Sequence, residues 1–320
     1  MEDCEPSPLN CPLCSNPRVR QFFRKSGHTY YRCPSCAHLF VFPLPSRQAV
    51  HKYCEESYSS QYLVKMRAWF EVLARRRVEI LASLFSAASG RRLLDVGCGY
   101  GFFLKEAQSR GWDALGIEAS LLPLLFAREE LGVHVIEHEL EDVFTALKLD
   151  FDAITFWHVL EHLEQPASAM NEAIEHLRPG GCLIVNSPNI DSAVFKIVGK
   201  RWSWIYAPGH NHYFSLSGLA GWLERRGLEL VVRTTWTAAP NLYFLLQEAL
   251  LLGIVDALAA VRLPPLPRLT RRLRAFVSSD YYQTALQLRL QRVYQRSPWI
   301  DGFLRRRDLG HEFVIIARKR

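Results

Sequence analysis

The stretch LLDVGCGYGFFL, residues 93–104, decides the fold because it joins an apolar strand to a helix through a glycine turn. Gly97, Gly99 and Gly101 follow the strand directly, and such glycines let a ligand approach the backbone at the helix N-terminus. The spacing G-x-G-x-G departs from the G-x-G-x-x-G turn that binds a pyrophosphate, and Asp95 lies two residues before the first glycine. A carboxylate there would repel a pyrophosphate but suits a ligand that carries an ammonium and a sulfonium, such as S-adenosylmethionine.

Around this turn, apolar strand-like runs alternate with helix-like runs from Arg91 onward. Alternation with short connections predicts right-handed βαβ units. We therefore expect an α/β fold, Rossmann-like and doubly wound, with a mostly parallel seven-stranded sheet. The predicted divisions are a zinc ribbon, a helical linker, a main domain in two pieces and a helical basic insertion. They span residues 1–46, 47–89, 90–236 with 310–320, and 237–309, respectively.

A second acidic residue supports a nucleoside ligand. Glu118 lies at the end of the second strand, 21 residues after Gly97, where an acid bonds ribose hydroxyls in dinucleotide-type folds. With both signals the sequence resembles the class I S-adenosylmethionine-dependent methyltransferases, over roughly Arg91 to Trp236 and the closing strand. The resemblance implies that the glycine turn holds the methionine end of the cofactor, Glu118 the ribose, and Glu139 or Glu141 the adenine. The expected cofactor-binding residues are Asp95, Gly97, Cys98, Gly99, Gly101, Glu118, Glu139, Glu141 and Trp157.

The motif HVLEH, from His158 to His162, directly follows the fourth strand of this pattern. By itself it matches the inverted zinc-protease signature H-x-x-E-H, which requires a long helix. Pro166 follows too soon for such a helix, so this interpretation is disfavoured. The segment instead resembles a methyltransferase branch that also carries a histidine-containing loop, here APGHNHYFSL at 207–216.

Quinone-precursor O-methyltransferases of similar pattern bind a divalent metal through E-x-x-E-H, where His158 replaces the first glutamate in this chain. The resemblance implies that His158, Glu161 and His162 could hold a divalent metal. Alternatively, His162 could act as a base, or only orient the loop. His210 and His212 lie in a loop that could cover the acceptor, where a neutral imidazole could accept a hydroxyl proton.

Two C-x-x-C pairs, Cys11 with Cys14 and Cys33 with Cys36, are separated by 18 residues near the N-terminus. This is the spacing of a four-cysteine zinc site. The module resembles a zinc ribbon, in which Zn²⁺ supplies folding free energy and has no open position for catalysis.

We expect a methyltransferase, most simply an O-methyltransferase, whose acceptor is a small molecule or a saccharide- or lipid-linked compound. Residues 262–320 contain 14 Lys and Arg against 4 Asp and Glu, a local charge of +10 within a chain of +7. An RNA methyltransferase that binds nucleic acid through the ribbon and this tail is therefore the alternative. A non-catalytic scaffold is a third hypothesis.

The N-terminus shows no basic region followed by an apolar core, so we expect a cytoplasmic protein. The apolar run within 241–275 contains Glu248 and Asp256, which argues against a transmembrane helix. Peripheral contact of this segment with the inner face of a membrane remains open.

Overall fold

The computed structural model describes residues 9–86, 89–139, 144, 147, 149–236 and 298–320. The chain divides into two compact units. The first holds Met1–Ser187, Tyr206–Arg233 and Val314–Arg320, and the second holds Pro188–Ile205 and Thr234–Phe313. Residues 237–297, with most of the expected insertion and the whole apolar run, lie outside the described residues. Among the helices described, none is long and apolar enough to cross a membrane.

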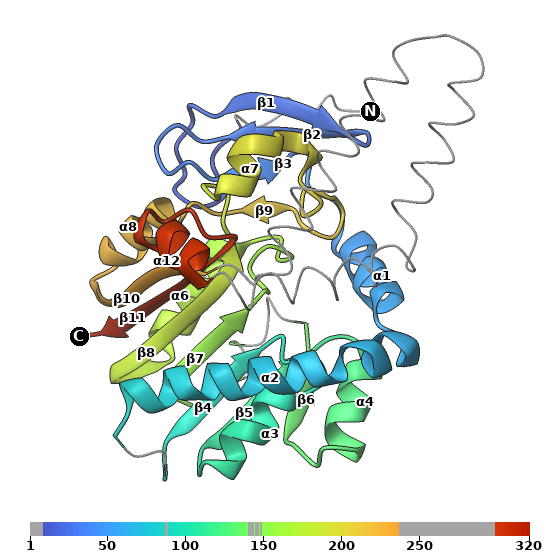
Figure 1. The fold of residues 1–320 in the computed structure, drawn as a ribbon, viewed down its shortest axis with the longest axis vertical. Coiled ribbons are helices and arrows are strands. Elements are labelled where there is room, and N and C mark those ends of the chain that lie inside the picture. The colour runs from blue at the N-terminus through green and yellow to red at the C-terminus, as the bar shows by residue number, and fades with distance from the viewer. Residues whose placement is uncertain (1–8, 87–88, 140–143, 145–146, 148, 237–297) are drawn as a thin grey trace, which may run out of the picture. The chain divides into compact units, whose positions relative to one another are not determined.

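A seven-stranded sheet forms the centre of the fold, in the order β10-β11-β8-β7-β4-β5-β6 (Figure 1). Strand β4 pairs in parallel with β5 and β7, and β5 with β6 and β7 with β8 are parallel as well. The mostly parallel Rossmann-like sheet expected from the alternation is therefore confirmed. Its strands are β4 (Arg92–Val96), β5 (Asp113–Glu118), β6 (Val135–Glu137), β7 (Phe151–Trp157), β8 (Leu177–Pro188), β10 (Leu228–Trp236) and β11 (Glu312–Lys319).

Four of the described helices, α1, α2, α7 and α8, begin after a serine whose hydroxyl caps the first turn. The Ser59 hydroxyl accepts a hydrogen bond from the Tyr62 backbone N–H, and the Ser215 hydroxyl accepts one from Gly218. The helices of the first unit are α1 (Arg47–Ser57), α2 (Ser60–Leu84), α3 (Phe102–Ser109), α4 (Leu121–Glu129), α6 (Pro166–Glu175) and α8 (Leu216–Glu224). The second unit contains α7 (Ala193–Val198), the 3₁₀ helix η1 (Gly199–Arg201) and α12 (Pro298–Arg306).

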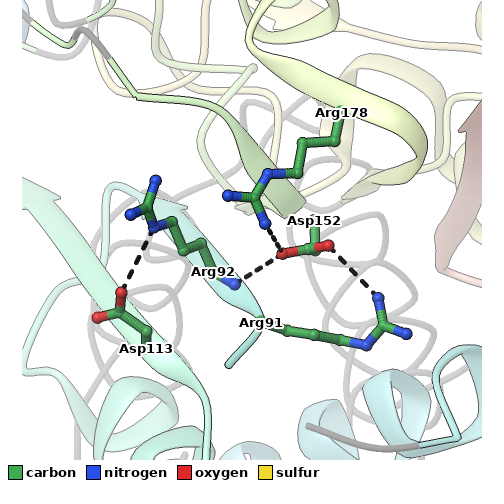
Figure 2. Close-up of polar contacts among 5 residues, drawn as sticks. All are labelled: Arg91, Arg92, Asp113, Asp152 and Arg178. Carbon is green, nitrogen blue, oxygen red and sulfur yellow. Dashed lines mark hydrogen bonds and ion pairs between the residues drawn. The ribbon is translucent and has the colours of Figure 1, made fainter. Parts of the chain in front are cut away.

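A cluster of polar contacts around Asp152 links the amino ends of neighbouring strands (Figure 2). The Asp152 carboxylate accepts hydrogen bonds from the Arg92 backbone N–H at 2.9 Å and from the Arg178 guanidinium at 2.8 Å. The Arg91 guanidinium lies 3.4 Å from the other carboxylate oxygen. These contacts bind β4, β7 and β8 together at the edge opposite the glycine turn.

The ribbon module forms a separate four-stranded antiparallel sheet with the order β1-β2-β3-β9 (Figure 1). Three strands are local: β1 (Arg20–Lys25), β2 (His28–Arg32) and β3 (Leu39–Val41). The fourth, β9 (His212–Tyr213), comes from the histidine-containing loop and pairs with β3. The ribbon is thus completed by a segment about 170 residues away in the chain, which local sequence patterns do not reveal.

Candidate functional site

A cavity of about 430 Å³ opens at the carboxyl edge of the parallel sheet. Ligand pockets commonly have volumes of about 300–1,000 Å³. The described residues that line it come from the segment before α1, from α1 and the start of α2, from the glycine turn, from the end of β5, and from the loops after β6, after β7 and before β9. They are Leu44, Pro45, Arg47, Val50, His51, Tyr53, Cys54, Ser57, Tyr58, Tyr62, Gly97, Glu118, Ala119, Ser120, Glu139, His158, Val159, His162, Leu163, Glu164, Tyr206 and Asn211.

Glu118 lines this cavity at the end of β5 and connects the glycine turn to Ser120. One carboxylate oxygen accepts a hydrogen bond from the Gly99 backbone N–H and the other from Ser120, each at 2.8 Å. Burial raises the pKa of Glu118, while the backbone donors oppose that shift. Because carboxylate oxygens have spare acceptor capacity, the same group can also accept the two hydroxyls of a ribose. These remaining acceptor positions on Glu118 fit the ribose hydroxyls of a nucleoside such as that of S-adenosylmethionine.

The glycines of the turn have different surroundings. A Cβ added at Gly99 would meet only the Tyr58 hydroxyl, 4.0 Å away, so the backbone there is accessible to a ligand. A Cβ added at Gly101 would lie 2.9 Å from Ala127 and from Val133, so this glycine is needed for close packing. Within one motif, an added Cβ would thus have open space at Gly99 and would clash with packed side chains at Gly101.

Asp95, expected near the cofactor, is 2% exposed, and the described lining residues do not include it. Its carboxylate accepts a hydrogen bond of 2.6 Å from the Thr155 hydroxyl on β7. Burial raises its pKa to about 7, and the hydrogen bond from Thr155 and the charge of Arg77 only partly oppose this. Asp95, two residues before the glycine turn, thus contacts the neighbouring strand β7.

The remaining expected cofactor residues are distributed unevenly. Glu139 is exposed and lines the cavity, whereas Glu141 lies outside the described residues. Trp157 is buried at the end of β7, with the Arg77 guanidinium 4.7 Å from its ring centre. Cys98 lies against Gly116, where its side chain would clash with an added Cβ, so it fills space between the turn and β5.

Helix α1 forms a wall of the cavity that the sequence analysis treated only as a linker. Glu55 accepts a hydrogen bond of 2.8 Å from the Leu121 backbone N–H, at the first turn of α4. At the other end of α1, Arg47 contacts Glu164 at 2.9 Å in the loop after β7. Polar residues at helical spacing are common in linkers, so they did not predict that α1 contacts α4 and the loop after β7.

The HVLEH motif forms a turn after β7, not a helix, so the zinc-protease interpretation is wrong. His158 has a φ of +59°, a backbone conformation that non-glycine residues adopt rarely. Its Nδ1 lies 3.0 Å from a carboxylate oxygen of Glu161, and the Ser187 hydroxyl donates to the other oxygen at 3.0 Å. Burial alone would raise the pKa of Glu161, but the contacts with His158 and nearby histidine charge lower it to about 2.

His162 lines the cavity and has a defined orientation. Its Nδ1 lies 2.7 Å from the Gly209 carbonyl oxygen, which can only accept, so Nδ1 carries the proton. The lone pair of the neutral ring is then on Nε2. The ring of His210 packs edge-on against it, with centres 4.8 Å apart. Glu161, His162 and His210 each offer a ligand atom, all within 4.8 Å of one another.

His212, the other expected base, is fully buried, and the described residues lining the cavity do not include it. It lies on β9 within the ribbon sheet, with Nδ1 3.3 Å from Nε2 of His38. Burial lowers the pKa of His212 well below its usual range. The loop 207–216 therefore places His210 beside His162 but His212 in the ribbon.

The four cysteines expected to hold zinc converge in the ribbon, and all four are free thiols. The sulfur atoms of Cys11 and Cys36 are 3.6 Å apart, and so are those of Cys14 and Cys33. Four sulfurs placed tetrahedrally at about 2.3 Å from Zn²⁺ would be roughly 3.8 Å apart. The residues present therefore fit a structural zinc ion, with no position left for a substrate.

Comparisons with known proteins agree with this arrangement. A family described as "Methyltransferase domain" matches residues 66–232. The ubiquinone biosynthesis O-methyltransferase of Alkalilimnicola ehrlichii is 31% identical over 173 residues, which cover 49% of this chain and 68% of that protein. Its namesake from Hahella chejuensis is 32% identical over 168 residues, covering 49% and 71%.

Among solved structures, a SAM-dependent methyltransferase from Archaeoglobus fulgidus matches with a TM-score of 0.48 at 16% identity. The match covers 82% of this chain and 100% of that one. A TM-score below 0.5 is too low to assign a family. The family assignment therefore depends on the sequence matches and on the strand order of the sheet.

Proposed function

This chain belongs to the methyltransferase-domain family of S-adenosylmethionine-dependent enzymes, and we propose that it transfers the methyl group to a hydroxyl oxygen with His162 as the base. The observation that carries the proposal is the fixed tautomer of His162. Its Nδ1–H is held by the Gly209 carbonyl, so Nε2 is available within the cavity that also contains Gly97 and Glu118. One cavity thus contains both the residues expected to bind the methyl donor and the proposed base for the acceptor.

The demands of the reaction match these groups. A sulfonium is a good leaving group, so catalysis consists mainly of aligning the methyl donor with the acceptor. A hydroxyl acceptor must also lose its proton, which Nε2 of His162 accepts as the new oxygen–carbon bond forms. The buried Glu161 carboxylate, with its pKa near 2, stays ionised and stabilises positive charge on the neighbouring imidazoles.

A divalent metal ion is an alternative means of activating the acceptor hydroxyl. Glu161, His162 and His210 would hold it, with His158 contacting Glu161 from the other side. Such an ion would supply Lewis acidity toward a hydroxyl oxygen. Imidazole and carboxylate ligands suit zinc and similar divalent ions. If His162 served as a ligand, its Nε2 would not be free as a base, so the two roles are alternatives.

The acceptor is a small molecule whose reacting hydroxyl lies on an apolar or aromatic body. The apolar and aromatic residues of the cavity lining include Tyr53, Tyr206, Leu163, Val50 and Leu44, and the Tyr206 ring lies against His210 with ring centres 4.4 Å apart. The two relatives named ubiquinone biosynthesis O-methyltransferases support an oxygen acceptor. A saccharide- or lipid-linked acceptor remains within the proposal, because aromatic walls bind sugar faces and apolar chains alike.

The test is S-adenosylhomocysteine release from S-adenosylmethionine with a panel of phenols, catechols and sugars. His162→Gln should lower kcat at least 100-fold while leaving S-adenosylhomocysteine affinity within twofold. His176→Gln is the matched control, because its Nδ1 also contacts a backbone carbonyl, that of Leu149, but outside the cavity. A His162→Gln enzyme with full activity would rule out the base assignment.

A further inference from the structure

Two buried histidines outside the cavity contact each other, one beside the expected zinc ligands and the other in the loop 207–216. His38 and His212 are both fully buried, with Nε2 of the first 3.3 Å from Nδ1 of the second. Their rings are stacked, with centres 5.2 Å apart, and His38 also stacks on Phe214 at 4.8 Å. Burying two imidazoles costs free energy that two apolar side chains would not cost. The pair therefore does more than fill space.

On the ribbon side, His38 contacts the expected zinc ligands. Its Nδ1 lies 3.7 Å from the sulfur of Cys11, and its carbonyl accepts a hydrogen bond of 2.9 Å from the Cys33 backbone N–H. A metal-bound thiolate can only accept, so Nδ1 of His38 must donate. Outer contacts of this kind orient metal ligands. Nε2 of His38 then has the lone pair that accepts from Nδ1–H of His212.

On the loop side, His212 belongs to the segment 207–216, which also contains the Gly209 carbonyl that contacts His162. Its backbone N–H and that of Asn211 both donate to the Glu161 carbonyl, at 3.2 and 2.8 Å. The Asn211 carbonyl in turn accepts from the Val41 backbone N–H on β3 at 3.0 Å. Gly209, whose carbonyl orients His162, is three residues before His212. A shift of His212 would therefore move the group that fixes the His162 tautomer.

We propose that His38 and His212 are positioning residues that connect the zinc-bound Cys11 thiolate to His162. The thiolate orients His38, His38 orients His212, and the segment from Gly209 to His212 then holds the His162 Nδ1–H. The zinc ribbon thus stabilises the part of the cavity wall that contains His162. This inference rests on the proposed role of His162, but its test does not depend on methyl transfer.

Two substitutions of His38 test its contact with Cys11 and its contact with His212 separately. The amide of Asn reaches about the position of His Nδ1, so His38→Asn keeps the Cys11 contact and loses the His212 contact. The amide of Gln reaches about the position of His Nε2, so His38→Gln does the reverse. Both side chains are polar and smaller than or similar to imidazole, which limits the packing change.

The experiment is ¹⁵N nuclear magnetic resonance of histidine-labelled, zinc-loaded protein, with the His162 signals assigned by their loss in His162→Gln. Zinc transfer to a chromophoric chelator and titration with S-adenosylhomocysteine accompany it. His38→Asn should keep the wild-type zinc transfer rate within twofold but show His162 as a mixture of tautomers. His38→Gln should release zinc at least tenfold faster, yet show the wild-type His162 tautomer while zinc is bound. S-adenosylhomocysteine affinity should stay within twofold in both.

A wild-type His162 spectrum in His38→Asn, with zinc and S-adenosylhomocysteine still bound, would overturn the proposal. If His38→Asn did not fold, chelation of zinc from the wild-type protein would decide. Unchanged His162 signals after zinc loss, with S-adenosylhomocysteine still binding, would overturn it equally. A fully active His162→Gln enzyme would instead remove the base assignment and leave the positioning result standing, so the two failures are distinguishable.

Discussion

Alanine substitutions at Gly99 and Gly101 should damage different properties of the protein, although both glycines belong to one turn. Both have positive φ, +54° and +78°, where an L residue costs roughly 1–2 kcal/mol of stability. At Gly101 the added methyl would also lie 2.9 Å from Ala127 and Val133, and such overpacking costs a further 1–3 kcal/mol or so. Gly101→Ala should therefore lose about 2–5 kcal/mol, and Gly99→Ala about 1–2 kcal/mol.

Ligand binding should show the opposite order. An added methyl at Gly99 would meet only the hydroxyl of Tyr58, a cavity-lining residue, at 4.0 Å, so we predict that it takes up space that the cofactor would use. We expect Gly99→Ala to weaken S-adenosylhomocysteine binding at least tenfold, which is about 1.4 kcal/mol. Gly101→Ala, measured where it is fully folded, should bind within about twofold of wild type, because its methyl points into packed core.

Urea unfolding gives the stability difference, and calorimetric titration gives the affinity. Gly132→Ala is the control for backbone strain alone, since its φ is +63° and an added Cβ would meet no atom within 4 Å. The reasoning fails if Gly101→Ala is no less stable than Gly132→Ala. It fails equally if Gly99→Ala binds S-adenosylhomocysteine as wild type does.

Three further predictions concern buried or capping carboxylates. The pKa of Asp95 is about 7 when folded against 3.8 for an exposed group, so its ionisation costs stability as pH rises between these values. Asp95→Asn should therefore gain stability relative to wild type from pH 5 to pH 8, by at most about 3 kcal/mol, because only the interval from pH 5 to the folded pKa contributes. Thermal melts with equal differences at both pH values would contradict this. The pKa of Glu161 is lowered to about 2, so its contribution is complete above pH 4.5 and is lost toward pH 2. Glu161→Gln should cost about 3 kcal/mol in urea unfolding at pH 7 and clearly less at pH 3, whereas an equal cost at both values would be inconsistent with the low pKa. Glu55→Gln weakens a charged cap on α4 and should lower stability by about 0.3–1 kcal/mol, with an unchanged melting temperature counting against the contact.

The alternation of strands and helices and the glycine turn predicted the parallel sheet, because both depend on local periodicity and backbone freedom. The two C-x-x-C pairs predicted the cysteine cluster for a similar reason, since short spacing fixes the geometry of the ligands. Glu118 also lies at the cavity as expected, because the carboxyl ends of parallel strands share one edge.

Other features depend on contacts between distant segments. The sequence alone placed His210 and His212 together as equivalent candidates, yet strand pairing with β3 draws His212 into the ribbon and leaves His210 beside His162. A period of two sets which face a side chain takes, but not which strand it pairs with. The role of α1 as a wall of the cavity was likewise not predicted, because the contact of Glu55 with Leu121 joins residues 66 positions apart in the chain.

The sequence by itself thus determined the fold class, the glycine turn, the place of Glu118 at the end of β5 and the cluster of four cysteines, which all arise from local spacing. Only the tertiary structure decided which histidine has a fixed tautomer within the cavity. It also decided that Asp95 contacts Thr155 and that the ribbon is completed by β9. These outcomes follow from burial and long-range hydrogen bonding, whose partners are separated by tens to hundreds of residues and leave no periodic signal in the chain.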